Sequence, residues 1–282
     1  MKVKVKKNER FSIGRLCIYI FLSLMSIIMI FPLYWMLRGA FMESPLDVMD
    51  VTKFFPNKWD FGNFKEAFTS APFGQYLINT LKLVVINVTG VILSSSLVAF
   101  GFSRIQFRYR ELFFGIVMAT MMIPGTVLQI PQFVGWVNIG AYDTIIPLTL
   151  PAWFGSATYI FMLRQFFMTL PKEYDEAARL DGAGYFRIYW QIILPLSKPA
   201  LLTVGVFTFM GVWNDFFGPL IYLPDESNWT LALGLSNFMG QYSSDWHLLM
   251  AASSVLVIPM IVIYFFAQRS FIEGIAFTGV KG

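Results

Sequence analysis

A short polar run between two apolar stretches carries the residues best suited to a specific interaction. It reads Glu176-Ala177-Ala178, then Gly182, then Ile192 and Leu194-Pro195. Glutamate supplies charge or a hydrogen bond, alanine lets a partner surface approach a helix axis closely, and glycine lets the backbone leave the helix. We expect this combination to mediate contact between proteins rather than to make or break bonds.

The local pattern predicts a short helix within this run. Thr169 is expected as its N-cap, with Pro171 in the first turn. Asp175 and Glu176 lie near the positive end of the helix dipole, and each is spaced to pair with Arg179. The glycines that follow end this helix, and an amphipathic segment then leads into the next apolar stretch. Composition alone leaves open a helix that only solvates a connection between two spans.

The residue counts exclude several kinds of chemistry. The chain has one cysteine, Cys17, and one histidine, His247, which are too few for a disulfide framework, a His/Cys metal site or a paired nucleophile. The nearest approach to a phosphate-binding loop is the string 274–281, whose lysine is one position late and lacks a Ser/Thr partner. No basic face interleaved with aromatic residues indicates nucleic acid. We therefore expect no enzyme, no catalytic or metal-binding residue, and no cofactor bound by this chain.

The elements that must position the polar run are membrane helices. Of the 282 residues, 56% are hydrophobic and 13% are charged, about half of the roughly 25% charged residues typical of soluble domains. We predict an all-α polytopic membrane protein with six transmembrane helices and the polar run between the fourth and fifth. The uncharged stretches of span length are 16–37, 76–102, 112–137, 145–168, 199–223 and 248–268.

The basic residues predict the orientation in the membrane. Sixteen of the 21 lysines and arginines fall in alternate connecting segments, namely 1–15, 104–110, 164–198 and 269–282. Because positive charge is retained on the cytoplasmic side, both termini and the polar run are expected there. The first apolar stretch is too long for a signal peptide and lacks a cleavage site. The predicted segments are a cytoplasmic 1–15, a first span 16–37, an extracellular 38–75, a core 76–271 containing the loop 169–198, and a cytoplasmic tail 272–282.

Polar residues near the spans are candidates for a solute pathway. Pro124 and Pro131 interrupt the third span, which indicates a helix that faces a pathway or a kinked packing helix. Asp215, expected in the outer half of a continuous fifth span, is a candidate for a pathway or for a structural hydrogen bond. Segment 39–75, rich in proline and aromatic residues, could lie on the membrane surface or form an ordinary loop. The pathway candidates are Trp213, Asn214, Asp215, Gln129, Gln132 and Asn87.

The spacing in the polar run resembles the loop signature of inner-membrane permeases of binding-protein-dependent ABC importers. Glu-Ala-Ala, three residues, Gly, nine residues, Ile, one residue and Leu-Pro all match. Further stretches resemble the carbohydrate-uptake branch, in particular the smaller maltose-transporter permease, over nearly the whole chain. These stretches are 163–167, 192–196 with Pro199, 213–216 and the ending 279–282.

This resemblance implies a transport subunit moved by a separate cytoplasmic ATPase dimer, which would bind ATP and Mg. The other implied partners are a homologous second permease, an extracellular solute-binding protein, a sugar substrate and membrane lipid, in a bacterial inner membrane. The ATPase contact, as a coupling helix, is assigned to Glu176, Ala177, Ala178, Asp181, Gly182 and Ala183. A second ATPase contact is assigned to Gly279, Val280, Lys281 and Gly282. The alternative is that these residues form a frayed chain end.

The resemblance also implies that loop 224–247 meets the solute-binding protein. The residues suited to contact a sugar or a protein there are Asp225, Asn228, Trp229, Asn237, Gln241, Tyr242 and Trp246. The alternative function is an ion-coupled secondary transporter, which would show inverted repeats and several buried ionisable groups. No clear repeat is visible in the sequence.

Overall fold

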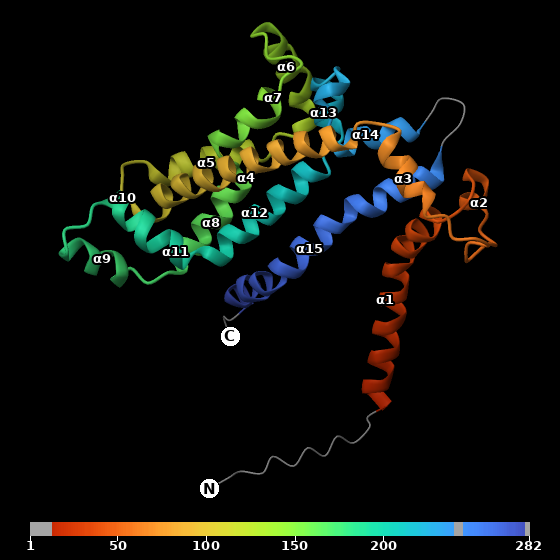
Figure 1. The fold of residues 1–282 in the computed structure, drawn as a ribbon. Helices are drawn as coiled ribbons and strands as arrows, with labels where there is room; N and C mark the ends of the chain where they lie inside the picture. The colour runs from red at the N-terminus through yellow and green to blue at the C-terminus, as the bar shows by residue number, and fades with distance from the viewer. Residues whose placement is uncertain (1–12, 240–244, 280–282) are drawn as a thin grey trace. The chain divides into compact units, whose positions relative to one another are not determined.

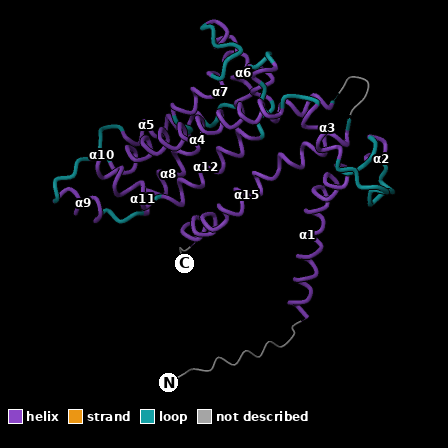
Figure 2. Tube along the Cα trace, viewed as in Figure 1, coloured by secondary structure: helices purple, strands orange, loops and turns teal. Residues whose placement is uncertain are grey.

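The computed structural model describes residues 13–239 and 245–279, and every regular element in these ranges is helical (Figure 1, Figure 2). The all-α prediction is confirmed. The chain divides into two compact units, residues 1–67 with 238–255 and residues 68–237 with 256–282. Helix α15 (Trp246–Gly279) contributes residues to both.

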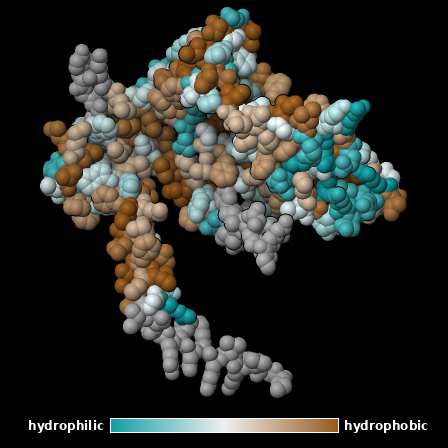
Figure 3. Space-filling model, turned by 180° about the vertical axis from the view of Figure 1, so that it is seen from behind, coloured by the Kyte–Doolittle hydropathy of each residue, from teal (hydrophilic) through white to brown (hydrophobic). Residues whose placement is uncertain are grey.

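The first unit contains α1 (Ile13–Ala40), α2 (Pro45–Met49) and most of α3 (Gly62–Thr69). Helix α1 carries the predicted first span. Its most apolar window has no buried residue, and Figure 3 shows apolar side chains covering this helix. A helix that is apolar all round is expected in lipid or against another membrane helix.

The C-terminal end of α1 is tightly packed within the first unit. A Cβ at Gly39 would lie 3.0 Å from the side chain of Met250. The Asn63 side-chain amide donates to the carbonyls of Ala40, at 3.0 Å, and Met42, at 2.8 Å. The chain after α1 is therefore an ordered structure rather than a loose connection.

Helix α4 (Phe73–Arg104) is the centre of the second unit and packs against α8 (Ala157–Thr169) and α12 (Lys198–Trp213). Gly205 of α12 lies against α4, where an added Cβ would be 3.4 Å from the Ile92 side chain, an ordinary van der Waals contact. The buried apolar core is formed by Val91, Ala99, Phe100, Leu163, Phe167, Ile188, Tyr189, Ile193, Ala200 and Val204.

One predicted span is bent, and a second bend lies just before the start of another. In place of one helix over 112–137, α5 (Arg110–Thr120) and α6 (Gly125–Asn138) meet at 89°. Pro124 marks the break, because proline has no amide hydrogen to continue the helix. Within the described residues, four helices are long and apolar enough to cross a membrane, or up to six if each bent pair is one span. The count of six spans therefore stays a prediction.

The second bend precedes α12. Helix α10 (Tyr185–Ile188), the π-helical turn 189–193 and α11 (Leu194–Leu196) form one arm, which meets α12 at 78°. The fourth span is completed by α7 (Ile146–Thr149), the 3₁₀ turn 150–154 and α8.

The fifth predicted span, 199–223, is not one continuous helix. Helix α12 ends at Trp213, and α13 (Phe217–Tyr222) follows after a break. In the break, the Asp215 carboxylate accepts a hydrogen bond from the Gly218 amide at 3.0 Å. The Asn214 side chain donates back to the Met210 carbonyl at 2.8 Å. Short polar side chains that bond to nearby backbone compete with the helix in this way, so Asp215 does not lie inside a helical span as predicted.

Short elements cover the N-terminal end of α4 in the second unit. They are a 3₁₀ turn at 226–228, α14 (Leu231–Gly234) and a 3₁₀ turn at 235–238. The Tyr76 hydroxyl donates to Glu226 at 2.6 Å, and a Cβ at Gly234 would lie 2.4 Å from the Tyr76 ring. This part of loop 224–247 is thus fixed to α4.

Candidate functional site

The polar run forms the predicted short helix, α9 (Glu173–Leu180). Its first turn carries Glu173, Asp175 and Glu176, which interact favourably with the positive end of the helix dipole. The N-cap, however, is Lys172 and not Thr169. Thr169 is the last residue of α8, where its hydroxyl donates to the Phe166 carbonyl at 2.7 Å.

Gly182 ends α9 as the sequence predicts, and the geometry shows why glycine is needed. Its φ is +79°, in the left-handed region that side-chain-bearing residues disfavour. The Gly182 amide donates to the Arg179 carbonyl at 3.0 Å, and the Ala183 amide donates to the Ala178 carbonyl at 2.9 Å. This pair of hydrogen bonds is a Schellman motif, which satisfies the last carbonyls of the helix and reverses the chain.

The two alanines of the motif differ in their surroundings. Ala178 packs against the buried core together with Ala183. Ala177 and Glu176 are exposed, and Leu180 is 90% exposed. The outward face of α9 therefore presents a charged residue, a small residue and a large apolar residue. This arrangement is suited to docking in a partially apolar cleft.

A buried ion pair fixes α9 to the rest of the unit. Asp175 and Arg104, both largely buried, lie 3.2 Å apart (Oδ2 to Nη1). The other guanidinium nitrogen of Arg104 donates to the carbonyls of Phe167, at 2.7 Å, and Leu170, at 2.9 Å. Arg104 thus joins the ends of α4, α8 and α9. Burial raises the pKa of Asp175 above its ordinary value, while the charge of Arg104 acts in the opposite direction.

The predicted partner of the α9 acids is different in the structure. Arg179 lies over the Tyr185 ring, 4.7 Å from its centroid, and Asp175 pairs with Arg104 instead. In the sequence, Arg104 stands out only as part of the basic segment 104–110. The available signal was a lone arginine at the end of a long apolar helix, but its partner is far away in the sequence.

The arm that follows α9 presents both a buried and an exposed face. Tyr189 is buried, and its hydroxyl lies 2.8 Å from the Ser96 hydroxyl of α4. Phe186 and Trp190 are exposed and stack at 6.4 Å with an interplanar angle of 14°. The exposed aromatic pair and the outward face of α9 belong to the same connection between α8 and α12. Figure 3 shows hydrophilic side chains gathered at the end of the second unit that carries α9 and α10.

The six pathway candidates do not gather in one place. Trp213 is buried, and its indole donates to the Leu256 carbonyl at 3.1 Å. Asn87 donates to the carbonyls of Leu83, at 2.9 Å, and Leu148, at 3.0 Å. These two side chains thus have packing partners. Gln129 is half-buried and Gln132 exposed on α6, and Asn214 and Asp215 lie at the break after α12.

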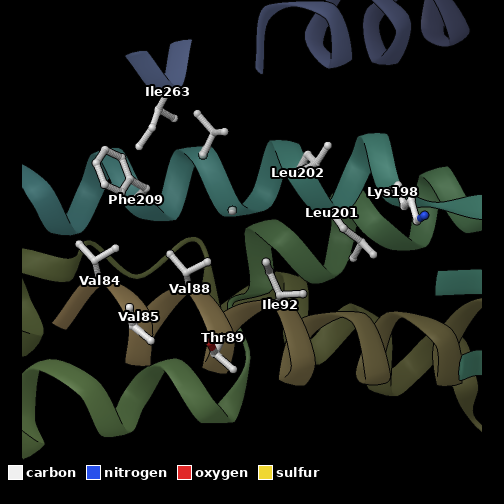
Figure 4. A pocket seen from close by; sticks show the side chains of 12 residues that line it. Val84, Val85, Val88, Thr89, Ile92, Lys198, Leu201, Leu202, Phe209 and Ile263 are labelled. Carbon is white, nitrogen blue, oxygen red and sulfur yellow. The ribbon is translucent and has the colours of Figure 1, made fainter. Parts of the chain in front are cut away.

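A groove of about 570 Å³ runs between α4 and α12, with Ile263 of α15 beside it (Figure 4). Its wall is apolar apart from Thr89 and Lys198, and none of the six pathway candidates lines it. Their assignment to a pathway stays a prediction.

Loop 224–247 uses several of its predicted contact residues internally. Asn228 donates to the Asp143 carboxylate at 3.1 Å, and Asn237 donates to the Tyr76 hydroxyl at 3.3 Å. Gln241 and Tyr242 lie outside the described residues, as do Val280, Lys281 and Gly282 of the tail. Gly279 is the last residue of α15.

Comparison with known proteins gives consistent matches. Residues 88–276 match the family described as "Binding-protein-dependent transport system inner membrane component". The chain is 30% identical to the probable ABC transporter permease protein YurM of Bacillus subtilis, over 100% of this chain and 94% of that protein. It is 29% identical to the arabinooligosaccharides transport system permease protein AraQ of the same organism, over 99% and 100%.

Several solved structures share the fold, and one of them has a high similarity over most of the chain. It is that of a bacterial ABC transporter involved in the import of the acidic polysaccharide alginate, with a TM-score of 0.80 and 23% identity. The match covers 91% of this chain and 96% of the other.

Proposed function

Because the chain belongs to the family of inner membrane components of binding-protein-dependent transport systems, we propose that it is the permease subunit of an ATP-driven importer for a sugar or oligosaccharide. The similarity to the arabinooligosaccharide permease supports this substrate class. The subunit sits in a bacterial cytoplasmic membrane with six spans and both termini in the cytoplasm. A second, homologous permease completes the channel, and an extracellular solute-binding protein delivers the sugar.

The observation that carries the proposal is the construction of α9. Its outward face, with Glu176, Ala177 and Leu180, is free to enter a cleft on a separate ATPase, while its inward face is anchored by the buried pair of Asp175 and Arg104. A force on α9 is therefore delivered directly to the ends of α4 and α8. Closure of an ATPase dimer on ATP and Mg would move these helices and switch the permease between inward-facing and outward-facing states.

The Schellman closure adds stiffness to this connection. Because Gly182 turns the chain back and Ala183 packs beside Ala178 on the core, α9 cannot rotate away without opening buried contacts. We assign Asp181 to the edge of the docking surface, since it is exposed at the end of α9. The tail from Gly279 to Gly282 is assigned a second ATPase contact.

Protection of a single thiol tests the docking. Cys17 is the only cysteine in the chain, so Cys17→Ser gives a background in which Leu180→Cys can be labelled alone. We expect a polar maleimide to label Leu180→Cys readily in the isolated chain and several-fold more slowly when the ATPase is bound. Gln106→Cys, exposed on the loop between α4 and α5, is the control and should change little. Equal labelling of Leu180→Cys with and without the ATPase would reject α9 as the docking element.

Uptake into proteoliposomes tests the transport function. The complex purified with this chain should accumulate a labelled oligosaccharide only with ATP on the α9 side and the binding protein on the other. Accumulation driven by an ion gradient without ATP would instead favour a secondary transporter.

A further inference from the structure

The segment between α1 and α3, residues 41–61, has an unusual distribution of polar and apolar groups. Large apolar side chains point outward, and Leu46 is 79% and Phe55 67% exposed. A loop surrounded by water normally does the opposite, with its apolar side chains covered and its carbonyls hydrated. The exposed apolar residues are Leu46, Met49, Val51, Phe54, Phe55, Trp59 and Phe61.

Four backbone carbonyls of the same segment are satisfied from the inside by one side chain. Arg38, near the end of α1, is only 2% exposed. Its guanidinium donates to four carbonyls of the segment, namely those of Asp47, at 3.1 Å, Val48, at 3.0 Å, Asp50, at 2.7 Å, and Lys53. Irregular backbone is tolerated near the apolar part of a membrane only when its polar groups are paired within the protein. Arg38 provides this pairing.

The position of Arg38 along α1 gives the depth of the segment. The stretch Leu16–Leu37 is uncharged and has 22 residues, about 33 Å of helix at 1.5 Å per residue, close to the roughly 30 Å of a bilayer core. Arg38 therefore lies at the boundary between hydrocarbon and headgroups. The segment 41–61 begins at this depth and, in the first unit, folds back on the end of α1.

Aromatic rings connect the segment to α1 at the same level. Trp35 packs edge-on against Phe54 with 6.4 Å between ring centroids, and Tyr34 against Phe55 with 6.3 Å. The Arg38 guanidinium lies 4.1 Å from the centroid of the Trp35 ring. Tyrosine and tryptophan are enriched where membrane helices meet the headgroups.

The charged groups of the segment are compatible with a position at the boundary between hydrocarbon and headgroups. Lys53 pairs with Asp47, and Lys58 lies 3.9 Å from Glu43. Long lysine side chains carry apolar stems and can place the ammonium group among lipid headgroups. The segment thus combines an outward apolar surface with charges that are paired or can reach the headgroups.

We propose that residues 46–55 insert their apolar side chains into the phospholipid leaflet at which α1 ends, as a monotopic anchor held in shape by Arg38. The occupant of this surface is lipid and not another protein chain. The inference depends on the membrane location of the chain and not on the substrate or the ATPase.

Nitroxide labels at single cysteines test the anchor in the full chain. In the Cys17→Ser background, Phe55→Cys and Leu46→Cys are labelled, and the protein is purified with its bound subunits and placed in phospholipid nanodiscs. Asn57→Cys, exposed in the same segment, is the matched polar control. We expect the ratio of accessibility to oxygen over a water-soluble nickel chelate to be several-fold higher at 46 and 55 than at 57.

The other outcomes are distinct and each overturns the proposal. Labels at 46 and 55 that are as accessible to the nickel chelate as the label at 57 would place the segment in water. Labels that are immobilised and inaccessible to both reagents would show that a protein partner covers the surface. Neither outcome depends on transport, so failure of the anchor leaves the test of the importer unaffected.

Discussion

Ala177 and Ala178 are adjacent, yet α9 gives them separate tasks. Ala178 packs on the core, whereas Ala177 faces outward. Ala178→Leu should therefore overpack the interior and reduce the free energy of unfolding by about 1–3 kcal/mol. Ala177→Leu should leave stability almost unchanged and weaken ATPase binding. Thermal unfolding and co-purification of the ATPase distinguish the two variants, and equal stability losses would contradict the assigned faces.

The pair of Asp175 and Arg104 leads to a prediction about stability. Asp175→Ala leaves a buried guanidinium without its partner charge, which typically costs about 3–5 kcal/mol. Asp175→Leu combined with Arg104→Met should recover part of this loss, because no unpaired charge then remains buried. Recovery is expected to be incomplete, since Arg104 also binds two carbonyls of the α8 end. Thermal unfolding in detergent compares the stability of both variants with that of the parent. An Asp175→Ala variant as stable as the parent would show that the pair is dispensable.

Arg38 is expected to hold segment 41–61 in shape. Arg38→Met removes the donors to four carbonyls, and we expect segment 41–61 to loosen. Lys58→Met, which removes an exposed charge, is the control. Limited proteolysis of the full chain in nanodiscs should cleave the Arg38 variant several-fold faster within this segment, and cleavage equal to that of the control would contradict the assigned role.

At the scale of elements, α9 and its glycine end could be predicted from local spacing. Glycine at this position indicates a left-handed end, and the structure places Gly182 at φ +79° with Schellman hydrogen bonds. Gly182→Ala should cost about 1–2 kcal/mol, the usual penalty for a left-handed alanine. Gly184→Ala, at a φ of −75°, should cost less. Thermal unfolding of the two variants compares them, and a larger loss at Gly184 would contradict this explanation.

Other elements could not be predicted because their cause is not local. Proline at 124 indicated a break, but the 89° angle between α5 and α6 depends on packing in three dimensions. The end of α12 at Trp213 was missed because the apolar composition continues to Tyr222. The hydrogen bond from the Gly218 amide to Asp215 lies in the break and is not visible in the composition. Likewise, nothing in the spacing around Asp175 identifies Arg104 as its partner.

At the scale of the whole molecule, the chain consists of a helical core around α4 and a separate unit led by α1. The composition and the alternation of basic segments were sufficient to predict a helical membrane protein. Composition and charge did not determine how many helices cross the membrane, because two of the candidate spans are bent pairs of helices. The loop that carries α9 lies at one end of the core, and the ion pair of Asp175 and Arg104 connects it to the long α4 helix.

We propose that this subunit has no motor of its own and is moved through α9. The most direct measurement is oligosaccharide uptake by proteoliposomes that contain the complete complex with Glu176→Lys, compared with Glu176→Gln. We predict that the lysine variant is inserted normally but loses ATP-driven uptake, because its charge is reversed at the docking surface, while the glutamine variant keeps much of it. Uptake at the parent rate with Glu176→Lys, or accumulation by this chain alone without an ATPase, would contradict the proposal that an ATPase moves the subunit through α9.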